Sequence, residues 1–249
     1  MRSHAQGFIS RVPHYNSIFN VLGDATLTDT LHDLIEGSAA PLSAVEKDFA
    51  VDSTGFGTSQ HFRYYSVKYQ REKARRVWIK AHAMVGVKTN IVTSVNVLPA
   101  YSSDSRQFLP LMRATQQHFP TIREISADKA YLDSWIVREV DKIGAVPFIP
   151  FKVNSHPSPY APVWTRMLHY FSLHREDFLA HYHKRSNVET TFSMIKRVFG
   201  DSVRSKTETA QTNEVLLKVL CHNIRVLIHE MHELGIDLAF RAGVNHPGV

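Results

Sequence analysis

Hydrophobic and polar positions divide the chain into a helical beginning, a strand-rich middle and a helical end. Between residues 14 and 40, apolar side chains recur three or four positions apart, and Gly23 and Gly37 interrupt them, which predicts two short helices. The apolar run 48–52 predicts a buried strand that ends at Ser53-Thr54-Gly55. Alternation over 76–84 and 90–98 predicts two further strands, and the three together indicate an antiparallel meander.

The second half of the chain alternates helices with short strands. Residues 105–119 have helical spacing, although Pro110 is compatible with a helix only if the helix begins near Gln107. A short strand over 122–127 ends at Asp128, and Asp133 caps the next helix. The apolar stretch 145–151 contains two prolines, which favours a strand at a sheet edge.

Three further segments, 164–180, 186–199 and 208–234, have the spacing of helices. The resulting order of elements is β-β-β-α-β-α-β followed by helices. It predicts an α/β fold with one mixed sheet, three antiparallel strands followed by two parallel ones, and helices on both faces.

Composition narrows the class of protein. The chain has 249 residues, of which 43% are hydrophobic and one, Cys221, is a cysteine. This excludes collagen-like, wholly disordered and disulfide-scaffold proteins. No apolar run approaches the roughly 20 residues that span a bilayer, and the first residues lack the apolar stretch of a signal peptide. We therefore expect a cytoplasmic protein.

Charge is distributed unevenly along the chain. The net charge is +6, yet residues 1–56 carry −4, so the remaining 193 residues carry +10. Segment 61–80 holds seven basic residues and one acidic residue, interleaved with tyrosines. It is either a footprint for a polyanion or a solvated hairpin face. On the first interpretation, the candidate DNA-binding residues of this segment are Arg63, Lys73, Arg75 and Arg76.

Two aspartates have the same local setting. Asp52 and Asp128 each follow an apolar strand directly. If the two strands are neighbours, both carboxylates emerge at the same edge of the sheet. Because buried carboxylates are unfavourable unless a cation or hydrogen bonds compensate them, the pair suggests a divalent metal. The alternative for either aspartate alone is a turn or a helix cap.

A third acidic residue lies in a set of four polar residues at helical spacing. Tyr182, Arg185, Glu189 and Lys196 stand at offsets 0, 3, 7 and 14, and on one helix they share a stripe roughly 60° wide. Glu189 can complete a three-carboxylate metal site, with the two cations binding phosphate oxygens beside it. The alternative is an exposed helix with an i,i+4 ion pair between Arg185 and Glu189. An adjoining apolar stripe can seat this helix on the sheet: Val188, Phe192, Ile195 and Phe199.

These four residues form a Y-(2)-R-(3)-E-(6)-K spacing that resembles the signature of bacterial and archaeal insertion-sequence transposases, in the insertion sequence four and five groups. The resemblance extends from about residue 45 to 234. It also includes Phe-Ala-Val-Asp52-Ser-Thr, Ala-Asp128-Lys-Ala-Tyr131 and the late segment 213–223. It implies an RNase H-like catalytic domain, which agrees with the order of elements.

The resemblance also implies a chemistry. Asp52, Asp128 and Glu189 correspond to a DDE triad that holds two Mg²⁺ ions, which Mn²⁺ can replace. Tyr182, Arg185 and Lys196 correspond to contacts with phosphates of the transposon end. The implied reaction is hydrolysis of phosphodiester bonds at double-stranded transposon ends, followed by attack of the freed 3′-OH on target DNA. The implied assembly on DNA is a homodimer.

We expect three regions along the chain. Residues 1–44 form a short helical segment, and one interpretation of it is a remnant of the larger N-terminal region by which family members recognise inverted repeats. Residues 45–234 form the RNase H-like DDE domain, with a short insertion at about 152–181, and 235–249 form a tail. Two other functions stay open: a truncated, non-catalytic transposase that binds DNA as an inhibitor, and an RNase H-like nuclease that only hydrolyses.

Overall fold

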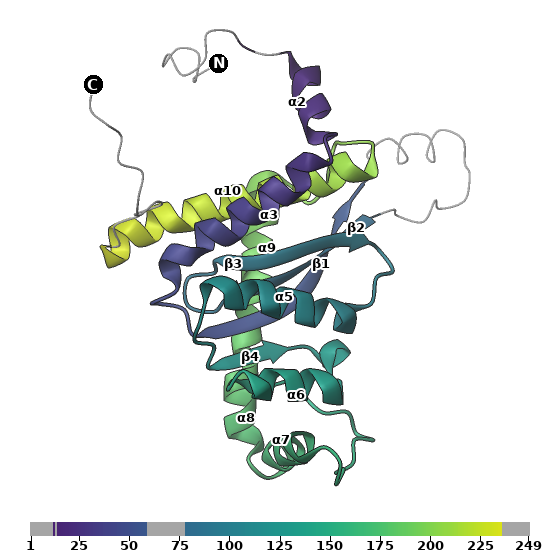
Figure 1. Ribbon diagram of the computed structural model, residues 1–249, viewed down its shortest axis with the longest axis vertical. Coiled ribbons are helices and arrows are strands. Elements are labelled where there is room, and N and C mark those ends of the chain that lie inside the picture. Colours follow the sequence, from purple (N-terminus) through teal and green to yellow (C-terminus); the bar gives the residue numbers. More distant parts are fainter. Residues whose placement is uncertain (1–11, 13, 59–77, 236–249) are drawn as a thin grey trace.

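The computed structural model of the protein describes residues 12, 14–58 and 78–235 (Figure 1). Arg63, Lys73, Arg75 and Arg76 of the basic segment lie outside the described residues. In the first part of the chain, the described residues form α2 (Tyr15–Leu22), α3 (Thr26–Ala39), the 3₁₀ turn η1 (Ala40–Leu42), β1 (Asp48–Gly57), β2 (Trp78–Gly86), β3 (Val92–Pro99), α5 (Asp104–His118), β4 (Glu124–Ala127), the 3₁₀ turn η2 (Lys129–Tyr131) and α6 (Ser134–Lys142). The second part consists of β5 (Val146–Phe148), α7 (Pro162–Leu173), α8 (Arg175–Tyr182), the 3₁₀ turn η3 (His183–Arg185), α9 (Ser186–Phe199) and α10 (Glu208–Leu234).

One five-stranded sheet lies at the centre, with strand order β3-β2-β1-β4-β5. The first three strands pair antiparallel, while β4 and β5 run parallel to β1. This confirms the predicted mixed sheet and its meander. Pro147 lies in β5 at the edge, where its missing N–H disrupts no inner ladder.

Strand β1 is longer than the sequence predicts. The turn expected at Ser53-Thr54-Gly55 is wrong, because β1 continues to Gly57 in register with β2. Gly55 lies opposite Lys80, and a Cβ built on it would stand 3.0 Å from Trp78. Pairing with a long neighbouring strand thus overrides local turn preference. As a result, Asp52 lies within the strand instead of at its end.

Helix α5 also departs from the prediction. It begins at Asp104, so Pro110 lies inside the helix and the expected start near Gln107 is wrong. Pro110 is exposed, and the carbonyl that it leaves without a helical partner belongs to Arg106, which is exposed as well. Water can therefore replace the missing hydrogen bond. Burial of apolar residues on the opposite side, such as Phe108 and Leu111, holds the helix on the sheet.

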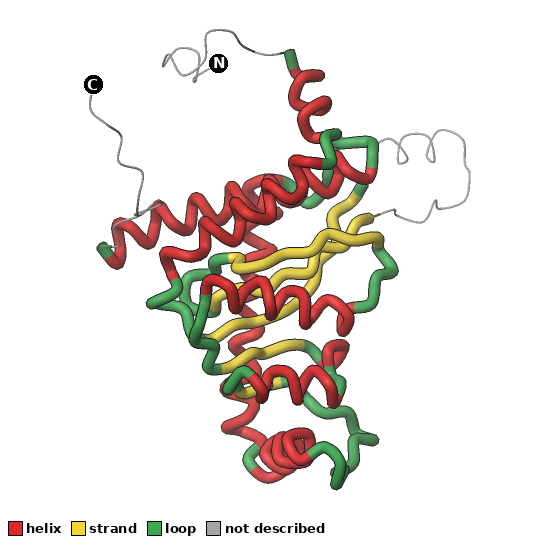
Figure 2. Tube along the Cα trace, in the orientation of Figure 1, coloured by secondary structure: helices red, strands yellow, loops and turns green. Residues whose placement is uncertain are grey.

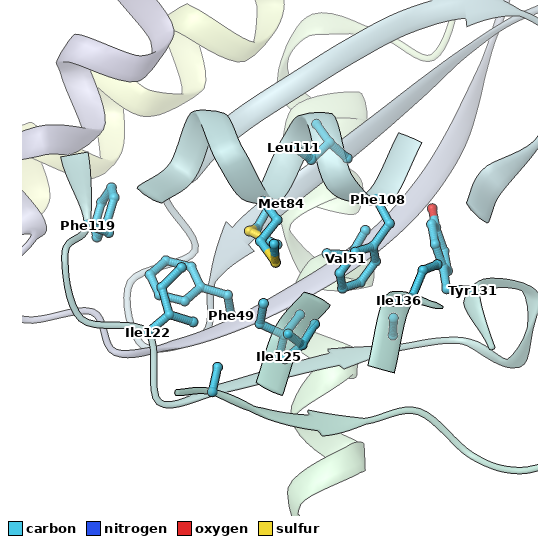
Figure 3. Packing of buried hydrophobic residues seen from close by; sticks show 14 of the residues in the cluster. Phe49, Val51, Met84, Phe108, Leu111, Phe119, Ile122, Ile125, Tyr131 and Ile136 are labelled. Atoms are coloured by element: carbon cyan, nitrogen blue, oxygen red, sulfur yellow. The ribbon is translucent and has the colours of Figure 1, made fainter. Parts of the chain in front are cut away.

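The sheet separates two layers of helices (Figures 1 and 2). Helices α5 and α6 cover one face, over a core that includes Phe49, Val51 and Met84 (Figure 3). Helix α9 covers the other face, and α3 and α10 pack side by side near β3. Along β1, side chains alternate between these faces, so Val51 faces α5 whereas Ala50 and Phe56 face α9 and α10.

The predicted insertion forms a small helical lobe beside β5 and α6. Its two helices, α7 and α8, meet at His174, where the backbone leaves helical geometry, so the single helical stretch expected over 164–180 is divided. An aromatic cluster holds the lobe, in which Phe148 packs against Phe178 and Phe151 against Trp164. Among the helices that the structure describes, none is both long and apolar enough to cross a membrane.

Candidate active site

Strand pairing brings the two candidate aspartates to neighbouring positions. The parallel register of β1 and β4 pairs Val51 with Ala127. Asp52 directly follows Val51, and Asp128 directly follows Ala127. The two aspartates therefore come just after the last paired positions of two adjacent strands. The sequence predicted that these carboxylates converge if their strands are neighbours. In the structure, β1 and β4 are neighbours. Asp128 is also the N-cap of η2 and accepts a hydrogen bond from Lys129 N.

Arg185 joins Asp52 to the third candidate acid, Glu189. Its Nη1 donates to Asp52 Oδ2 at 2.5 Å, and its Nη2 donates to Glu189 Oε1 at 2.6 Å. The other oxygen of Asp52, Oδ1, accepts a hydrogen bond from Ser53 N at 2.8 Å. The side chains of Arg185 and Asp52 are 18% and 19% exposed, whereas that of Glu189 is 56% exposed. The guanidinium is therefore enclosed between a strand and the first turn of α9.

The three acids and Arg185 are electrostatically coupled. Burial raises the pKa of Asp52, and the negative charges of Asp128 and Glu189 raise it further, while Ser53 N and Arg185 oppose this. Burial lowers the pKa of Arg185, but the carboxylates of Asp52, Glu189 and Asp128 outweigh burial and hold the pKa above its usual value. The site thus gathers more negative charge than a single arginine compensates.

Tyr182, Arg185 and Glu189 lie in three different elements, so the expectation of a single helical stripe is wrong. Tyr182 ends α8, Arg185 lies in η3, and Glu189 and Lys196 lie in α9. A 3₁₀ turn has three residues per turn instead of 3.6, which changes the angular offsets across it. The Tyr182 ring still lies near Arg185, with its centroid 6.0 Å from the guanidinium carbon.

Lys196 lies farther along β1. Its Nζ donates to Thr54 Oγ1 at 2.6 Å and stands 5.3 Å from the centroid of the Phe56 ring. Thr54 is two residues beyond Asp52 and faces the same side of the sheet. Burial lowers the pKa of Lys196, and Asp201 opposes this shift. The structure therefore brings Arg185 to two of the acids, with Tyr182 near Arg185, and places Lys196 farther along the strand.

An ion network that the sequence analysis did not predict lies at the start of the same strands. Lys184 Nζ contacts Asp48 Oδ2 at 2.9 Å and Glu124 Oε1 at 2.5 Å. Asp48 and Glu124 are register partners at the beginning of β1 and β4. His181 Nδ1 lies 2.6 Å from the second oxygen of Glu124. This network anchors α8 and η3, which carry Tyr182 and Arg185. The signal in the sequence was an acidic residue at the start of each of the two strands.

A second polar cluster lies on the face of the sheet that α5 covers. Asp104, in the first turn of α5, binds Lys80, and its Oδ1 lies 3.4 Å from both Ser53 Oγ and His82 Nδ1. His82 is fully buried, and burial lowers its pKa to about 4, although Asp104 opposes this shift. Burial, with the charges of Asp104 and Asp52, also raises the pKa of Tyr131. This cluster backs the strand that carries Asp52.

The acids suit a divalent cation in donor chemistry, because hard cations such as Mg²⁺ prefer carboxylate oxygens. Asp52 and Glu189 already share one cationic group, the guanidinium of Arg185. As the side chains stand, no three His, Cys, Asp or Glu residues within the described part of the chain are grouped so as to hold a metal ion. The residues therefore fit a metal in type and charge, while Arg185 takes the position of the counter-ion.

Comparison with protein families defines the class of protein. Residues 43–224, almost three quarters of the chain, match the family described as the transposase DDE domain. The chain belongs to this family. The prediction of a DDE transposase is confirmed at this level, as is the RNase H-like α/β fold with its mixed sheet. The protein is thus a transposase-family enzyme that acts on DNA, in a family that typically uses divalent metals.

Proposed function

We propose that this protein is the catalytic core of an insertion-sequence transposase of groups four and five. It hydrolyses phosphodiester bonds at transposon ends and then joins the freed 3′-OH to target DNA. Asp52, Asp128 and Glu189 are the catalytic carboxylates. The observation that carries this proposal is the register of β1 with β4, which sets Asp52, in β1, at a neighbouring position to Asp128, the residue that follows β4, together with the link through Arg185 to Glu189.

The three carboxylates are the groups that would hold two Mg²⁺ ions, or Mn²⁺ in their place. Ions bound there would supply Lewis acidity, which would lower the pKa of an attacking water and stabilise the leaving oxygen. The chain's own residues supply orientation. Ser53 N fixes one oxygen of Asp52, and the sheet fixes the separation of the two strands. Such a rigid arrangement suits phosphoryl transfer, which depends on positioning and on neutralisation of charge.

DNA contacts are proposed on the same face. The Arg185 guanidinium suits phosphate because it can donate two parallel hydrogen bonds, and Tyr182 lies next to it. Lys196 extends the positive charge along β1 toward Thr54. Between Gly57, which ends β1, and Trp78, which begins β2, the sequence adds further candidate contacts with double-stranded DNA: Arg63, Lys73, Arg75 and Arg76. Two copies of the chain are proposed to assemble on the two ends of the element.

The test is metal-dependent cleavage and joining of DNA. Purified protein is incubated with supercoiled target DNA and pre-cleaved element ends, with Mg²⁺ or Mn²⁺. Asp52→Asn, Asp128→Asn and Glu189→Gln should each lower the rate more than about a hundredfold, as expected when an electrostatic catalytic group is removed. Glu176→Gln is the matched control, because Glu176 is an exposed acid on α8 outside the site. Triad variants as active as the wild type would overturn the proposal.

The same assay separates the alternative functions. Nicking with no joined product identifies a nuclease that only hydrolyses. DNA binding that weakens with salt, without any cleavage by the wild type, identifies a non-catalytic binding protein that can act as an inhibitor.

A further inference from the structure

We propose that Arg185 is an exchangeable counter-ion: it occupies the acids in the DNA-free protein, and a DNA phosphate draws it away, so that DNA binding opens the site to metal. This inference rests on the proposed function, because it assigns a regulation to the same carboxylates. Its consequence is that metal and DNA bind cooperatively through one side chain.

Other groups of the protein already occupy the carboxylate of Asp52. Both of its carboxylate oxygens already have partners, Oδ1 with Ser53 N and Oδ2 with Arg185 Nη1. The amide of Ser53 belongs to a paired strand and cannot withdraw without breaking the sheet. Among the described residues, the contacts of the guanidinium are all with side chains, those of Asp52, Glu189 and Tyr182. A cation that approaches Asp52 must therefore displace Arg185 or stand beside its positive charge.

The negative charge of the three acids exceeds the positive charge of Arg185. One guanidinium bridges Asp52 and Glu189, while Asp128 adds a third negative charge nearby. A divalent ion compensates these charges better than arginine does. However, arginine and metal repel each other strongly in a half-buried site, where the effective dielectric constant is low. The two cations therefore compete for the same oxygens.

The Arg185 side chain can move while the backbone of η3 stays in place. The preceding residue, Lys184, is bound to Asp48 and Glu124, so η3 stays attached to the sheet when the Arg185 side chain moves. The ion-pair partners of Arg185 are Asp52 and Glu189, the two acids that a metal would need. A phosphate can accept the same two N–H groups in a bidentate contact. A single movement of the Arg185 side chain would therefore bind a phosphate and leave the two acids free to bind metal.

Linkage makes the inference measurable. If DNA removes Arg185 from the acids, DNA raises metal affinity, and metal raises DNA affinity by the same factor. The opposing possibility is a fixed ion pair, in which Arg185 stays on Asp52 whatever else binds. A fixed pair predicts that removing Arg185 leaves metal affinity unchanged or weakens it.

The experiment measures Mn²⁺ binding by the full chain, from the electron paramagnetic resonance signal of free Mn²⁺, with and without a linear duplex oligonucleotide. Wild-type protein should bind Mn²⁺ at least about tenfold more tightly when the duplex is present, as an allosteric coupling of ordinary size allows. Arg185→Met should bind Mn²⁺ at least about tenfold more tightly than wild type without DNA. In this variant, the further gain caused by DNA should be much smaller than in wild type.

Three comparisons decide the outcome. Lys142→Met is the matched control, because it removes a cation that pairs with Glu139 on α6 and contacts none of the three site acids, and it should keep the DNA-induced gain. Equal Mn²⁺ affinity of wild type with and without DNA would overturn the inference, and this arm needs no variant to fold. An equal DNA-induced gain in wild type and Arg185→Met would overturn it as well, since the gain would then come from the DNA phosphates alone.

A different result would reach further. If Mn²⁺ binds neither wild type nor Arg185→Met in any condition, and Asp52→Asn changes nothing, then the proposed metal-dependent function fails together with this inference. If Asp52→Asn abolishes Mn²⁺ binding while Arg185→Met has no effect on it, the proposed function stands and only the exchange of Arg185 is overturned.

Discussion

The carboxamide of Asn223 pairs with both backbone polar groups of Val92, 131 residues away. Val92 N donates to Asn223 Oδ1 at 3.0 Å, and Asn223 Nδ2 donates to Val92 O at 2.8 Å. Val92 begins β3, the edge strand of the sheet. The Asn223 side chain thus satisfies the N–H and C=O of Val92 at the sheet edge, where a further strand would otherwise pair. The same amide group reaches Ser38 Oγ at 3.0 Å and so joins α3 to α10.

We expect Asn223→Ala to lower the free energy of unfolding by about 2–4 kcal/mol, because it leaves several buried polar groups without partners. Urea denaturation measures the loss. The control is Glu233→Ala, an exposed change on the same helix that should stay within about 0.5 kcal/mol. A loss below about 1 kcal/mol for Asn223→Ala would mean that water satisfies these groups.

Lys184 and Arg123 offer a second test, since both bind the carboxylate of Asp48. Arg123 is 67% exposed, whereas Lys184 is 30% exposed and also neutralises Glu124, which is 6% exposed. Removing Lys184 leaves two adjacent acids poorly compensated. We therefore expect Lys184→Met to destabilise by about 2–4 kcal/mol in urea denaturation at pH 7, and Arg123→Met by less than about 1 kcal/mol.

The pH dependence of this difference has a definite sign. Burial alone would raise the pKa of Asp48, but Arg123 and Lys184 outweigh burial and lower it. A lowered carboxyl pKa stabilises the fold above the unfolded value of 3.8, and the stabilisation is lost as pH falls through the folded value. The gap between Lys184→Met and wild type should therefore narrow in acid. A gap that widens there would contradict the ion-pair explanation.

The paired strands were predictable from sequence, and the contacts between distant side chains were not. Alternation located β2 and β3, and the placement of Asp52 and Asp128 after apolar runs predicted that their carboxylates converge if the two strands are neighbours, which they are. In contrast, the end of β1 depends on pairing with Trp78 and its neighbours, which no local preference encodes. A helical spacing linked Arg185 to Glu189, but it could not indicate that the guanidinium also reaches Asp52.

His82 should make stability depend on pH. It is fully buried, neither ring nitrogen has a hydrogen-bond partner among the described residues, and its pKa is about 4. Below pH 6.5 the unfolded chain binds a proton that the folded chain excludes, so stability falls as pH drops from 6.5 toward 4. The loss from this group is on the order of 3 kcal/mol over that range.

The check is a series of urea denaturations between pH 7 and pH 4 for wild type and His82→Leu. Because the remaining groups titrate in both proteins, the difference between them isolates His82. Relative to wild type, His82→Leu should become steadily more stable as pH falls. His232→Leu, an exposed change on α10, should run parallel to wild type. Parallel curves for His82→Leu and wild type would show that His82 is protonated in the fold.

Lys196 distinguishes a phosphate contact from a purely structural one. Its ammonium donates to Thr54 Oγ1 and lies over the Phe56 ring, contacts that could by themselves account for its position. If Lys196 binds one DNA phosphate, Lys196→Met lowers the slope of log affinity against log salt concentration by about one, because one fewer counterion is released. Fluorescence anisotropy with a labelled duplex at several salt concentrations measures this slope.

Two controls separate the charge of Lys196 from its structural contacts. Thr54→Val removes the hydrogen bond to Lys196 and keeps the charge, so the salt slope should stay unchanged even if affinity shifts. Lys142 pairs with Glu139 on α6, and α6 covers the opposite face of the sheet from α9. Lys142→Met removes this charge and should therefore leave the salt slope unchanged as well. A Lys196→Met slope equal to that of wild type would assign Lys196 to the packing of α9 on β1, because a lysine that releases no counterion contacts no phosphate.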